Sequence, residues 1–209
     1  TYSPEQTDLA ELDVESVCPK ERYYYETGGI VFLANSPVES GSCRYTDVWI
    51  AHNRIERVSR SGIFLTGLWN RRPGTPWGVN PYYSDCNGWY PSERIEISDN
   101  TVCYSGGDGI VLIGSVDSCI EGNVSYHSNY LGREGHANAG IWPIGCKRVL
   151  IQYNEAAYSH LEHGSADGEG FDIDIGNEDV LFRYNYAHDN DGGAILLCNA
   201  QTTQPLFDE

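Results

Sequence analysis

A short module recurs along the chain and constrains the fold more than any other feature. Its first part is an apolar residue, two further residues and an asparagine, and its second part is a glycine that opens a short apolar strand. The asparagines are Asn53, Asn100, Asn123, Asn154 and Asn185. The glycines that follow them are Gly62, Gly109, Gly140, Gly170 and Gly193, and Gly29 opens a similar strand earlier. A repeat of this kind indicates units that bury their apolar faces by stacking on one another.

The spacing of the asparagines, 47, 23, 31 and 31 residues, predicts one coil per unit, with loops inserted in the longer units. No amphipathic helix separates the strands, and stacked asparagines can bond to the coils above and below. We therefore predict an all-β, right-handed parallel β-helix over residues 29–199, as part of a longer β-helix. Inserted loops are expected at 67–92, 131–138 and 159–168, a non-repeating segment at 1–28 and a tail at 200–209. An antiparallel sandwich explains the recurrent module poorly.

The composition narrows the classes of partner. The chain of 209 residues has 30 acidic and 13 basic residues, which give a formal charge of -17. Such a charge argues against nucleic acid and against an anionic membrane surface, and no apolar run reaches the roughly 20 residues that span a membrane. Among the seven cysteines, Cys119 and Cys198 lie in or beside apolar strand patterns, so we expect them in the core rather than in disulfides.

The most unusual strand runs from Gly168 to Ile175. Its apolar residues alternate with Asp172 and Asp174, so the two carboxylates should share the outer face of the coil. In this reading the inward residues of successive glycine-opened strands are Ile63 and Leu65, Ile110 and Leu112, Ile141 and Pro143, Phe171 and Ile173, and Ala194 and Leu196. Trp142 should then lie beside Asp172. An aromatic ring next to carboxyls suits the binding and cleavage of a sugar.

Further residues could complete such a site. Glu169 precedes the acidic strand and Asp191 lies in the bend of the next coil, so both are expected to converge on Asp172 and Asp174. The candidate substrate-binding residues are Trp142, Asp108, His188, Trp69, Trp77 and Arg133. Two other readings stay open for the acids, a solvated strand face or a calcium site made by Asp167, Asp172 and Asp174. His188 also fits a structural role, because polar residues recur at its bend.

The repeat resembles the pectin-lyase-like β-helix superfamily, and the most specific resemblance covers residues 147–199. There Gln152-Tyr153-Asn154, Asp167 to Asp174 and Tyr184 to Gly193 look like secreted bacterial proteins that degrade plant polysaccharides, and most like the β-helical glycoside hydrolases of family 141. The resemblance implies hydrolysis of xylan or fucosylated pectic chains outside the cell, without a required cofactor. It makes Asp172 and Asp191 the leading catalytic candidates, with Glu169 and Asp174 as alternates.

Two other functions stay open. A calcium-dependent polysaccharide lyase needs a basic residue to take a proton from the sugar, and no convincing base lies on the acidic face. A non-catalytic carbohydrate-binding β-helix would use the same acids to hold calcium. The motif series of polygalacturonases is absent from this sequence.

Overall fold

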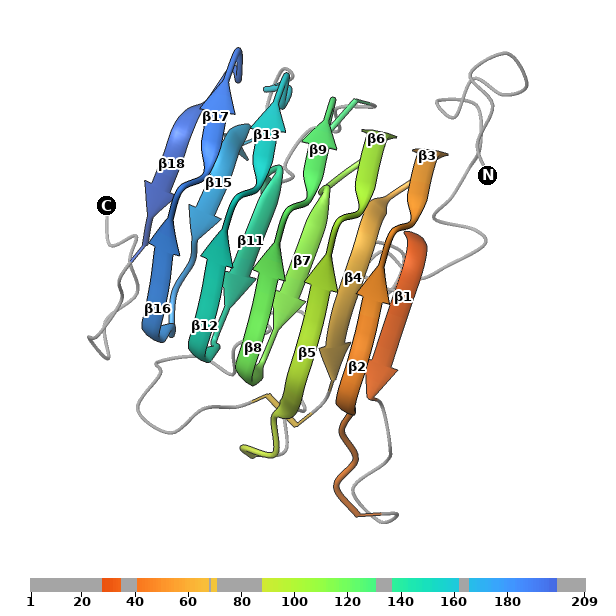
Figure 1. Ribbon diagram of the computed structural model, residues 1–209, viewed down its shortest axis with the longest axis vertical. Helices are drawn as coiled ribbons and strands as arrows, with labels where there is room; N and C mark the ends of the chain where they lie inside the picture. Colours follow the sequence, from red (N-terminus) through yellow and green to blue (C-terminus); the bar gives the residue numbers. More distant parts are fainter. Residues whose placement is uncertain are drawn as a thin grey trace.

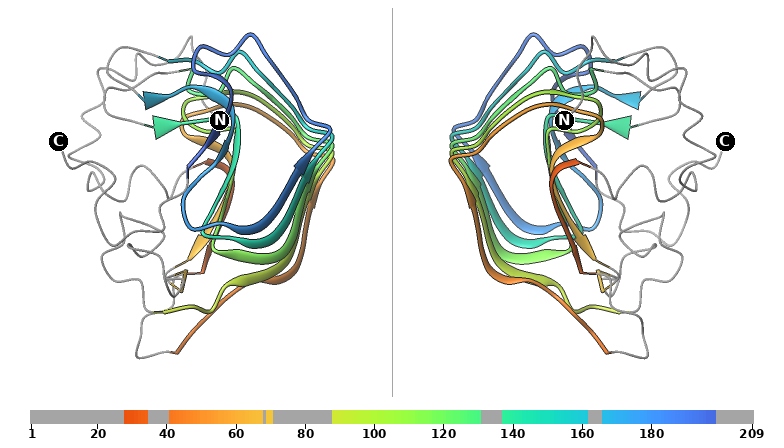
Figure 2. Two further views of the ribbon diagram at one scale, coloured as in Figure 1. Left: turned by 90° about the vertical axis from the view of Figure 1, so that its left-hand side faces the viewer. Right: turned by 90° about the vertical axis from the view of Figure 1, so that its right-hand side faces the viewer.

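The chain folds into a stack of parallel β-strands, as Figure 1 shows for the computed structural model. The structure describes residues 28–34, 41–67, 69–70, 88–130, 137–161 and 166–198. Within these ranges all regular structure is strand, and there is no helix long and apolar enough to cross a membrane. Seen along the stack, the coils superpose (Figure 2). The predicted all-β parallel β-helix is confirmed.

Each full coil contributes one strand to each of three sheets, and all pairs within these sheets are parallel. Sheet A contains β1 (Gly28–Ala34), β4 (Ser61–Gly67), β7 (Ile110–Ile113), β11 (Ile141–Ile144), β15 (Glu169–Ile173) and β18 (Gly193–Leu197). Sheet B contains β2 (Thr46–Ala51), β5 (Ser92–Ser98), β8 (Ser115–Glu121), β12 (Lys147–Gln152) and β16 (Glu178–Arg183). Sheet C contains β3 (Arg54–Val58), β6 (Thr101–Ser105), β9 (Val124–Tyr126), β13 (Glu155–Ala157) and β17 (Tyr186–His188). A separate parallel pair joins β10 (Ala137–Asn138) to β14 (Ala166–Asp167).

The space enclosed by the three sheets is an apolar core. Its fully buried members include Ile63, Leu65, Ile110, Leu112, Ile141 and Phe171 from sheet A and Ile97, Ile120 and Ile151 from sheet B. These are the inward positions that the alternation predicts for sheet A. Phe171 also meets Phe182 edge to face, with the ring centroids 5.1 Å apart. The coils therefore share one continuous core, as the stacking of a repeat requires.

The asparagines form the expected ladder at the corner between sheets B and C. Each Nδ2 donates to the Oδ1 of the next asparagine at 2.9 to 3.0 Å, from Asn53 through to Asn185. The backbone N–H of each asparagine donates to the same Oδ1 at 2.9 to 3.0 Å. One amide thus satisfies backbone groups that a sharp corner would otherwise leave unpaired.

The glycines that open the sheet A strands have a different physical reason. A Cβ on Gly140 would lie 2.5 Å from the carbonyl oxygen of Gly170, and one on Gly109 would lie 2.2 Å from the carbonyl oxygen of Gly140. Neither glycine has a positive φ. The close approach of the next coil, rather than backbone conformation, therefore requires glycine at these positions.

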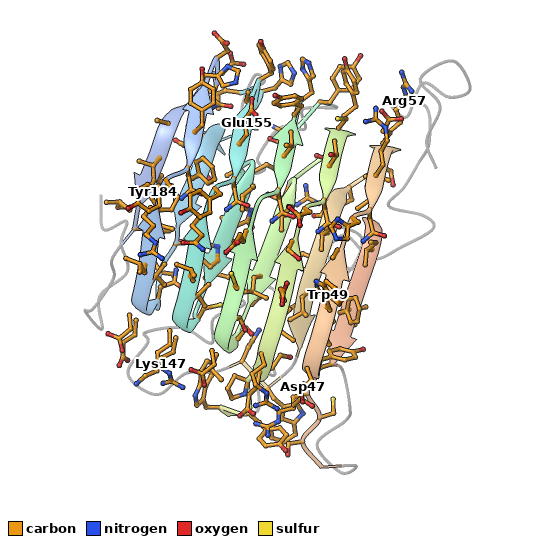
Figure 3. The ribbon with its side chains drawn as sticks, viewed as in Figure 1. Asp47, Trp49, Arg57, Lys147, Glu155 and Tyr184 are labelled. Atoms are coloured by element: carbon orange, nitrogen blue, oxygen red, sulfur yellow. The ribbon has the colours of Figure 1, made fainter. Side chains whose placement is uncertain are left out.

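A row of alternating charges runs along one edge of sheet B. Asp47, Arg94, Asp117, Arg148 and Asp179 occupy equivalent positions in successive coils, and all five have φ between 52 and 56°. Arg94 donates from Nε and Nη2 to Asp47 at 2.6 and 2.9 Å, and Arg148 makes the same pair of bonds to Asp117 at 2.5 and 2.6 Å. Figure 3 labels Asp47 at one end of this row. Opposite charges thus stack where like charges would repel.

The alignment of the last coil differs from the prediction by one residue. Gly193 pairs with Glu169 and not with Gly170, so Ile195 and Leu197 share rows with the inward Phe171 and Ile173. The predicted inward positions Ala194 and Leu196 were therefore wrong. The reason is visible in the sequence, because Gly193 follows its asparagine by eight residues, whereas Gly62 and Gly109 follow theirs by nine.

The structure places Cys119 and Cys198 outside the core in which they were expected. Cys119 lies on the outer face of sheet B, in one row with Glu96 and Leu150, and is not a core residue as expected. Cys198 packs against a second apolar cluster outside the core. Both are free thiols, so the expectation that neither forms a disulfide is confirmed.

Candidate active site

The acidic strand lies near the C-terminal end of the stack, as strand β15 of sheet A. Phe171 faces the core and is 1% exposed, and it pairs with Ile141 of β11 and Ile195 of β18. Asp172 points to the opposite face, next to Trp142 on one side and Leu196 on the other. The expected pairing of an aromatic ring with the acidic strand is therefore present.

The outer face of sheet A is not open to solvent as a groove floor would be. Phe64 and Val111 are 0% exposed there, and together with Ile113, Ile144 and Ile175 they form a second apolar cluster. Trp142 and Cys198 pack against this cluster. Asp172 borders it and is 5% exposed, so the solvated strand face is ruled out for this residue.

Burial and like charges change the acidity of the carboxyls. Burial, followed by the charges of Asp174, Asp167, Glu169 and Asp108, raises the pKa of Asp172 to about 9. Burial, followed by the charges of Glu169, Asp174 and Asp108, raises the pKa of Asp167 to about 6. Burial also raises the pKa of Glu169 and of Asp174. At neutral pH the group therefore holds protons that isolated carboxylates would release.

The carboxyl groups differ in their exposure and in their hydrogen bonds. Oδ1 of Asp172 and Oε2 of Glu169 are buried and have no hydrogen-bond partner in the described part of the chain. Asp174 is partly exposed, and its Oδ1 accepts a hydrogen bond from the Ile175 N–H at 2.6 Å. Asp167 is partly exposed as well, and the positive φ of Asp167 and Gly168 breaks the strand alternation between it and β15. Glu169 is also partly exposed, but its Oε2 is buried, so the two partly exposed aspartates are the better placed to meet a substrate.

Asp108 was expected to contact substrate, but the structure buries it to 1% exposure. Its Oδ1 accepts hydrogen bonds from the indole Nε1 of Trp142 at 2.9 Å and from the Ala139 N–H at 3.2 Å. Its Oδ2 lies 3.5 Å from Nη2 of Arg60. Asp108 therefore orients the indole of Trp142 through a buried hydrogen bond. The sequence pattern does not reveal this role.

The side chains of Asp191 and His188 make their hydrogen bonds with residues outside the acidic strand. Asp191 is exposed in the bend before β18, where its Oδ2 accepts a hydrogen bond from the Leu161 N–H at 3.0 Å. His188 lies on sheet C and contacts Glu155 at 3.1 Å, and Figure 3 labels Glu155. The Asp191 side chain thus lies beside Leu161 and His160, and its convergence on Asp172 stays a prediction.

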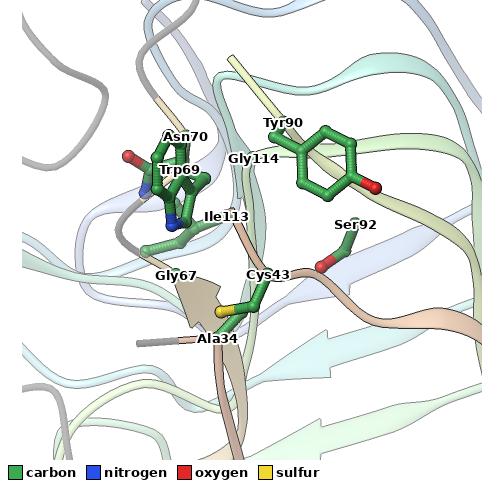
Figure 4. A pocket seen from close by; sticks show the side chains of 9 residues that line it. All are labelled: Ala34, Cys43, Gly67, Trp69, Asn70, Tyr90, Ser92, Ile113 and Gly114. Atoms are coloured by element: carbon green, nitrogen blue, oxygen red, sulfur yellow. The ribbon is translucent and has the colours of Figure 1, made fainter. Parts of the chain in front are cut away.

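Trp69 lies in a different place from the acids. It lines a small pocket with Asn70, Cys43 and Tyr90 (Figure 4). The pocket adjoins the ends of β1, β4 and β7, and β11 separates these strands from β15. Trp77 and Arg133 lie outside the described residues.

One cluster of side chains could hold a cation. Asp172, Asp174 and Cys198 each offer a ligand atom, and these atoms lie within 4.8 Å of one another. The expected calcium set had Asp167 in place of Cys198. Calcium takes oxygen ligands, so a thiol is a poor third member of this cluster, and its burial, followed by the charges of the neighbouring acids, raises its pKa to about 12.

Known proteins resemble this chain in sequence and in structure. A family model for the right-handed beta helix region matches residues 86–207. A lacto-N-biosidase of Bifidobacterium longum subsp. longum is 34% identical over 207 residues, which cover 86% of this chain and 13% of that protein.

Two crystal structures of the GH136 lacto-N-biosidase from Eubacterium ramulus also align with it. The native form has a TM-score of 0.62 and 25% identity, over 83% of this chain and 29% of that one. The selenomethionine form has a TM-score of 0.60 and 27% identity, over 79% of this chain and 27% of that one. The chain thus spans less than a third of the length of each relative. By its sequence and its stacked coils, this chain belongs to the right-handed β-helix family.

Proposed function

We propose that this chain carries the catalytic carboxyls of a glycoside hydrolase, on β14 and β15. The observation that carries the proposal is the group of Asp167, Glu169, Asp172 and Asp174. Burial raises the pKa of all four, and the charges of neighbouring acids further raise the pKa of Asp167 and of Asp172. Glycosidic bonds are cleaved by two carboxyls, one protonated and one ionised. The lacto-N-biosidase relatives support a glycosidase over the other functions that the sequence leaves open.

The environment of each carboxyl suggests its role. Asp167 has a pKa of about 6 and is partly exposed, which suits a general acid that works near neutral pH. Asp174 is partly exposed, and the Ile175 N–H stabilises its ionised form, which suits a nucleophile or base. Asp172 is buried and has a pKa of about 9, so it stays protonated at neutral pH and adds no negative charge to the group. This assignment replaces Asp172 and Asp191 as the leading pair.

Trp142 supplies the apolar contact that sugar binding needs. Its ring packs against the apolar cluster of sheet A and its Nε1 is fixed by Asp108, in the row next to Asp172. A fixed indole beside acids favours one orientation of a sugar ring. For the substrate we favour an oligosaccharide with a lacto-N-biose unit, because two relatives are lacto-N-biosidases. Xylan and fucosylated pectic chains, which the resemblance to family 141 implies, are the second choice.

The test is hydrolysis by the polypeptide that contains this chain. We expect release of p-nitrophenol from a p-nitrophenyl lacto-N-bioside, and little or none from xylosides and fucosides. Asp167→Asn and Asp174→Asn should each lower kcat at least about 100-fold, since general acid–base catalysis contributes about that much or more. Asp172→Asn should retain much of the activity, because the amide resembles the protonated carboxyl, and Asp191→Asn should retain all of it.

Other outcomes would point elsewhere. If Asp172→Asn abolishes hydrolysis and Asp167→Asn does not, the buried aspartate is the catalytic one and the roles proposed for Asp167 and Asp172 are wrong. An unsaturated product that absorbs ultraviolet light, formed only with calcium, would show a lyase. Sugar binding that survives all four substitutions, with no product from any glycan, would show a binding module.

A further inference from the structure

Arg60 is an unusual arginine for its burial. It lies between β3 and β4, and its side chain is 6% exposed. The other described ion-paired arginines, such as Arg94 and Arg148, have side chains that are 26% exposed or more. A buried guanidinium costs a great deal of solvation free energy unless fixed partners compensate it. The identity of those partners indicates what Arg60 does.

The first partner leads to the strand of the candidate acid. Nη1 of Arg60 donates to Oδ1 of Asn138 on β10 at 2.6 Å. Asn138 pairs with Asp167 on β14, and its carbonyl oxygen accepts from the Gly168 N–H at 2.8 Å. The strand that carries Asp167 is only two residues long and pairs with β10 alone in the described structure. β10 is therefore one support of Asp167, beside β15, which begins two residues later, and the Gly192 N–H, which donates to the Gly168 carbonyl oxygen at 3.0 Å.

The second partner leads to the aromatic ring. Nη2 of Arg60 lies 3.5 Å from Oδ2 of Asp108, whose Oδ1 holds the indole of Trp142. Arg60 thus contacts one oxygen of the Asp108 carboxyl group while the other oxygen accepts the hydrogen bond from Trp142. The charge of Asp108 in turn contributes to the raised pKa of Asp167, after burial and the charges of Glu169 and Asp174.

The backbone makes room for this side chain. A Cβ on Gly107 would lie 1.8 Å from Nη1 of Arg60, so no other residue fits there while Arg60 keeps its place. The Gly107 N–H also donates to the Arg60 carbonyl oxygen at 3.2 Å. The backbone at Gly107 therefore packs directly against the guanidinium group of Arg60.

We propose that Arg60 is a positioning residue that fixes Asp167 through Asn138 and Trp142 through Asp108. The inference rests on the proposed function, because it assigns a role in the same site. Neither Asn138 nor Asp108 is a proposed catalytic carboxyl, so Arg60 acts through them on the geometry of the acid and of the sugar platform together. Arg60 directly precedes β4, which lies two strands away from β11 in sheet A.

The test uses substrates with different leaving groups. The dinitrophenolate group leaves a dinitrophenyl glycoside without a proton, whereas the sugar that leaves an oligosaccharide must be protonated by the general acid. We expect Arg60→Gln to lower kcat on the oligosaccharide at least about ten-fold more than on the dinitrophenyl glycoside. Partial unfolding would lower both rates by one factor, so equal losses would overturn the proposal.

A second variant covers the case in which Arg60→Gln does not fold. Asn138→Ala leaves the contact between Arg60 and Asp108 in place. It removes the hydrogen bond from Arg60 to β10 and also the one that Asn138 donates to Asn129 at 3.0 Å. It should show the same dependence on the leaving group, and an unchanged ratio would again overturn the proposal. Arg148→Gln, which removes an exposed arginine that is paired with Asp117, is the matched control and should leave both rates unchanged.

A readout without catalysis separates this proposal from the proposed function. Hydrogen exchange of the Trp142 indole N–H, assigned with Trp142→Phe, should accelerate in Arg60→Gln and not in Arg148→Gln. If the wild-type protein cleaves no glycan but this exchange responds, the proposed function fails and the role of Arg60 in holding Trp142 stands. If exchange does not respond, the role of Arg60 in holding Trp142 is wrong.

Discussion

Asn123 lies in the middle of the asparagine ladder and is 0% exposed. Its Oδ1 accepts from the backbone N–H and the Nδ2 of Asn100 at 3.0 and 2.9 Å. Its Nδ2 donates to Oδ1 of Asn154 at 3.0 Å and to the Ile97 carbonyl oxygen at 2.8 Å. Replacement of Asn123 by alanine removes all of these bonds at once and leaves the Asn100 N–H buried without the acceptor that it has in the structure.

The expected loss of stability follows from these contacts. A buried donor that loses its acceptor costs about 1–3 kcal/mol, and each further hydrogen bond contributes about 0.5–1.5 kcal/mol net. Asn123→Ala should therefore lower the free energy of unfolding by about 3–5 kcal/mol. Asn53→Ala is the matched control. Asn53 is partly exposed, and among the described residues its side-chain amide bonds to Asn100 and Ala51, so its loss should cost about 1 kcal/mol.

The assay is urea unfolding followed by circular dichroism, with both variants measured beside the wild type. The two variants remove the same chemical group from the same ladder, and they differ in burial and in the number of partners. Equal losses of stability in Asn123→Ala and Asn53→Ala would refute the reasoning. The ladder would then mark a corner of the coil without stabilising it.

Three further predictions use the same unfolding measurement. Gly140→Ala should cost about 1–3 kcal/mol, because its Cβ would lie 2.5 Å from the Gly170 carbonyl oxygen, and a wild-type midpoint would show that the coils can move apart. Phe171→Ala should cost about 3–5 kcal/mol through the cavity left in the core, and a smaller loss would show that the coils collapse around it. Burial raises the pKa of Asp172 from 3.8 to about 9, so the folded state keeps a proton that the unfolded chain releases, and stability should fall as pH rises through this window. Asp172→Asn should flatten that dependence, and an unchanged pH profile would contradict the raised pKa.

The sequence locates the acidic strand but not the working carboxyls within it. Alternation correctly places Asp172 opposite Phe171 and beside Trp142, because it depends only on the period of a strand. It assigns equal exposure to Asp172 and Asp174, whereas the apolar surroundings bury the first and leave the second partly exposed. Asp167 is considered only as a calcium ligand, since the turn at Gly168 hides its relation to the strand.

The network around Arg60 has no signal in the sequence. Arg60 and Asn138 are 78 residues apart, and Asp108 belongs to a coil between them. A charged residue before a strand is read as solvated unless its surroundings are known. These contacts follow from the stacking of coils with unequal loops, which the repeat does not specify.

The sequence by itself determines the repeat, and with it the parallel coils, the apolar core and the asparagine ladder. These follow from local rules, since period, glycine and asparagine act within one coil and on the coil next to it. Only the tertiary structure decides which acids are buried and which cation pairs with Asp108. The reason is that desolvation and charge depend on every neighbour in space, including those from other coils.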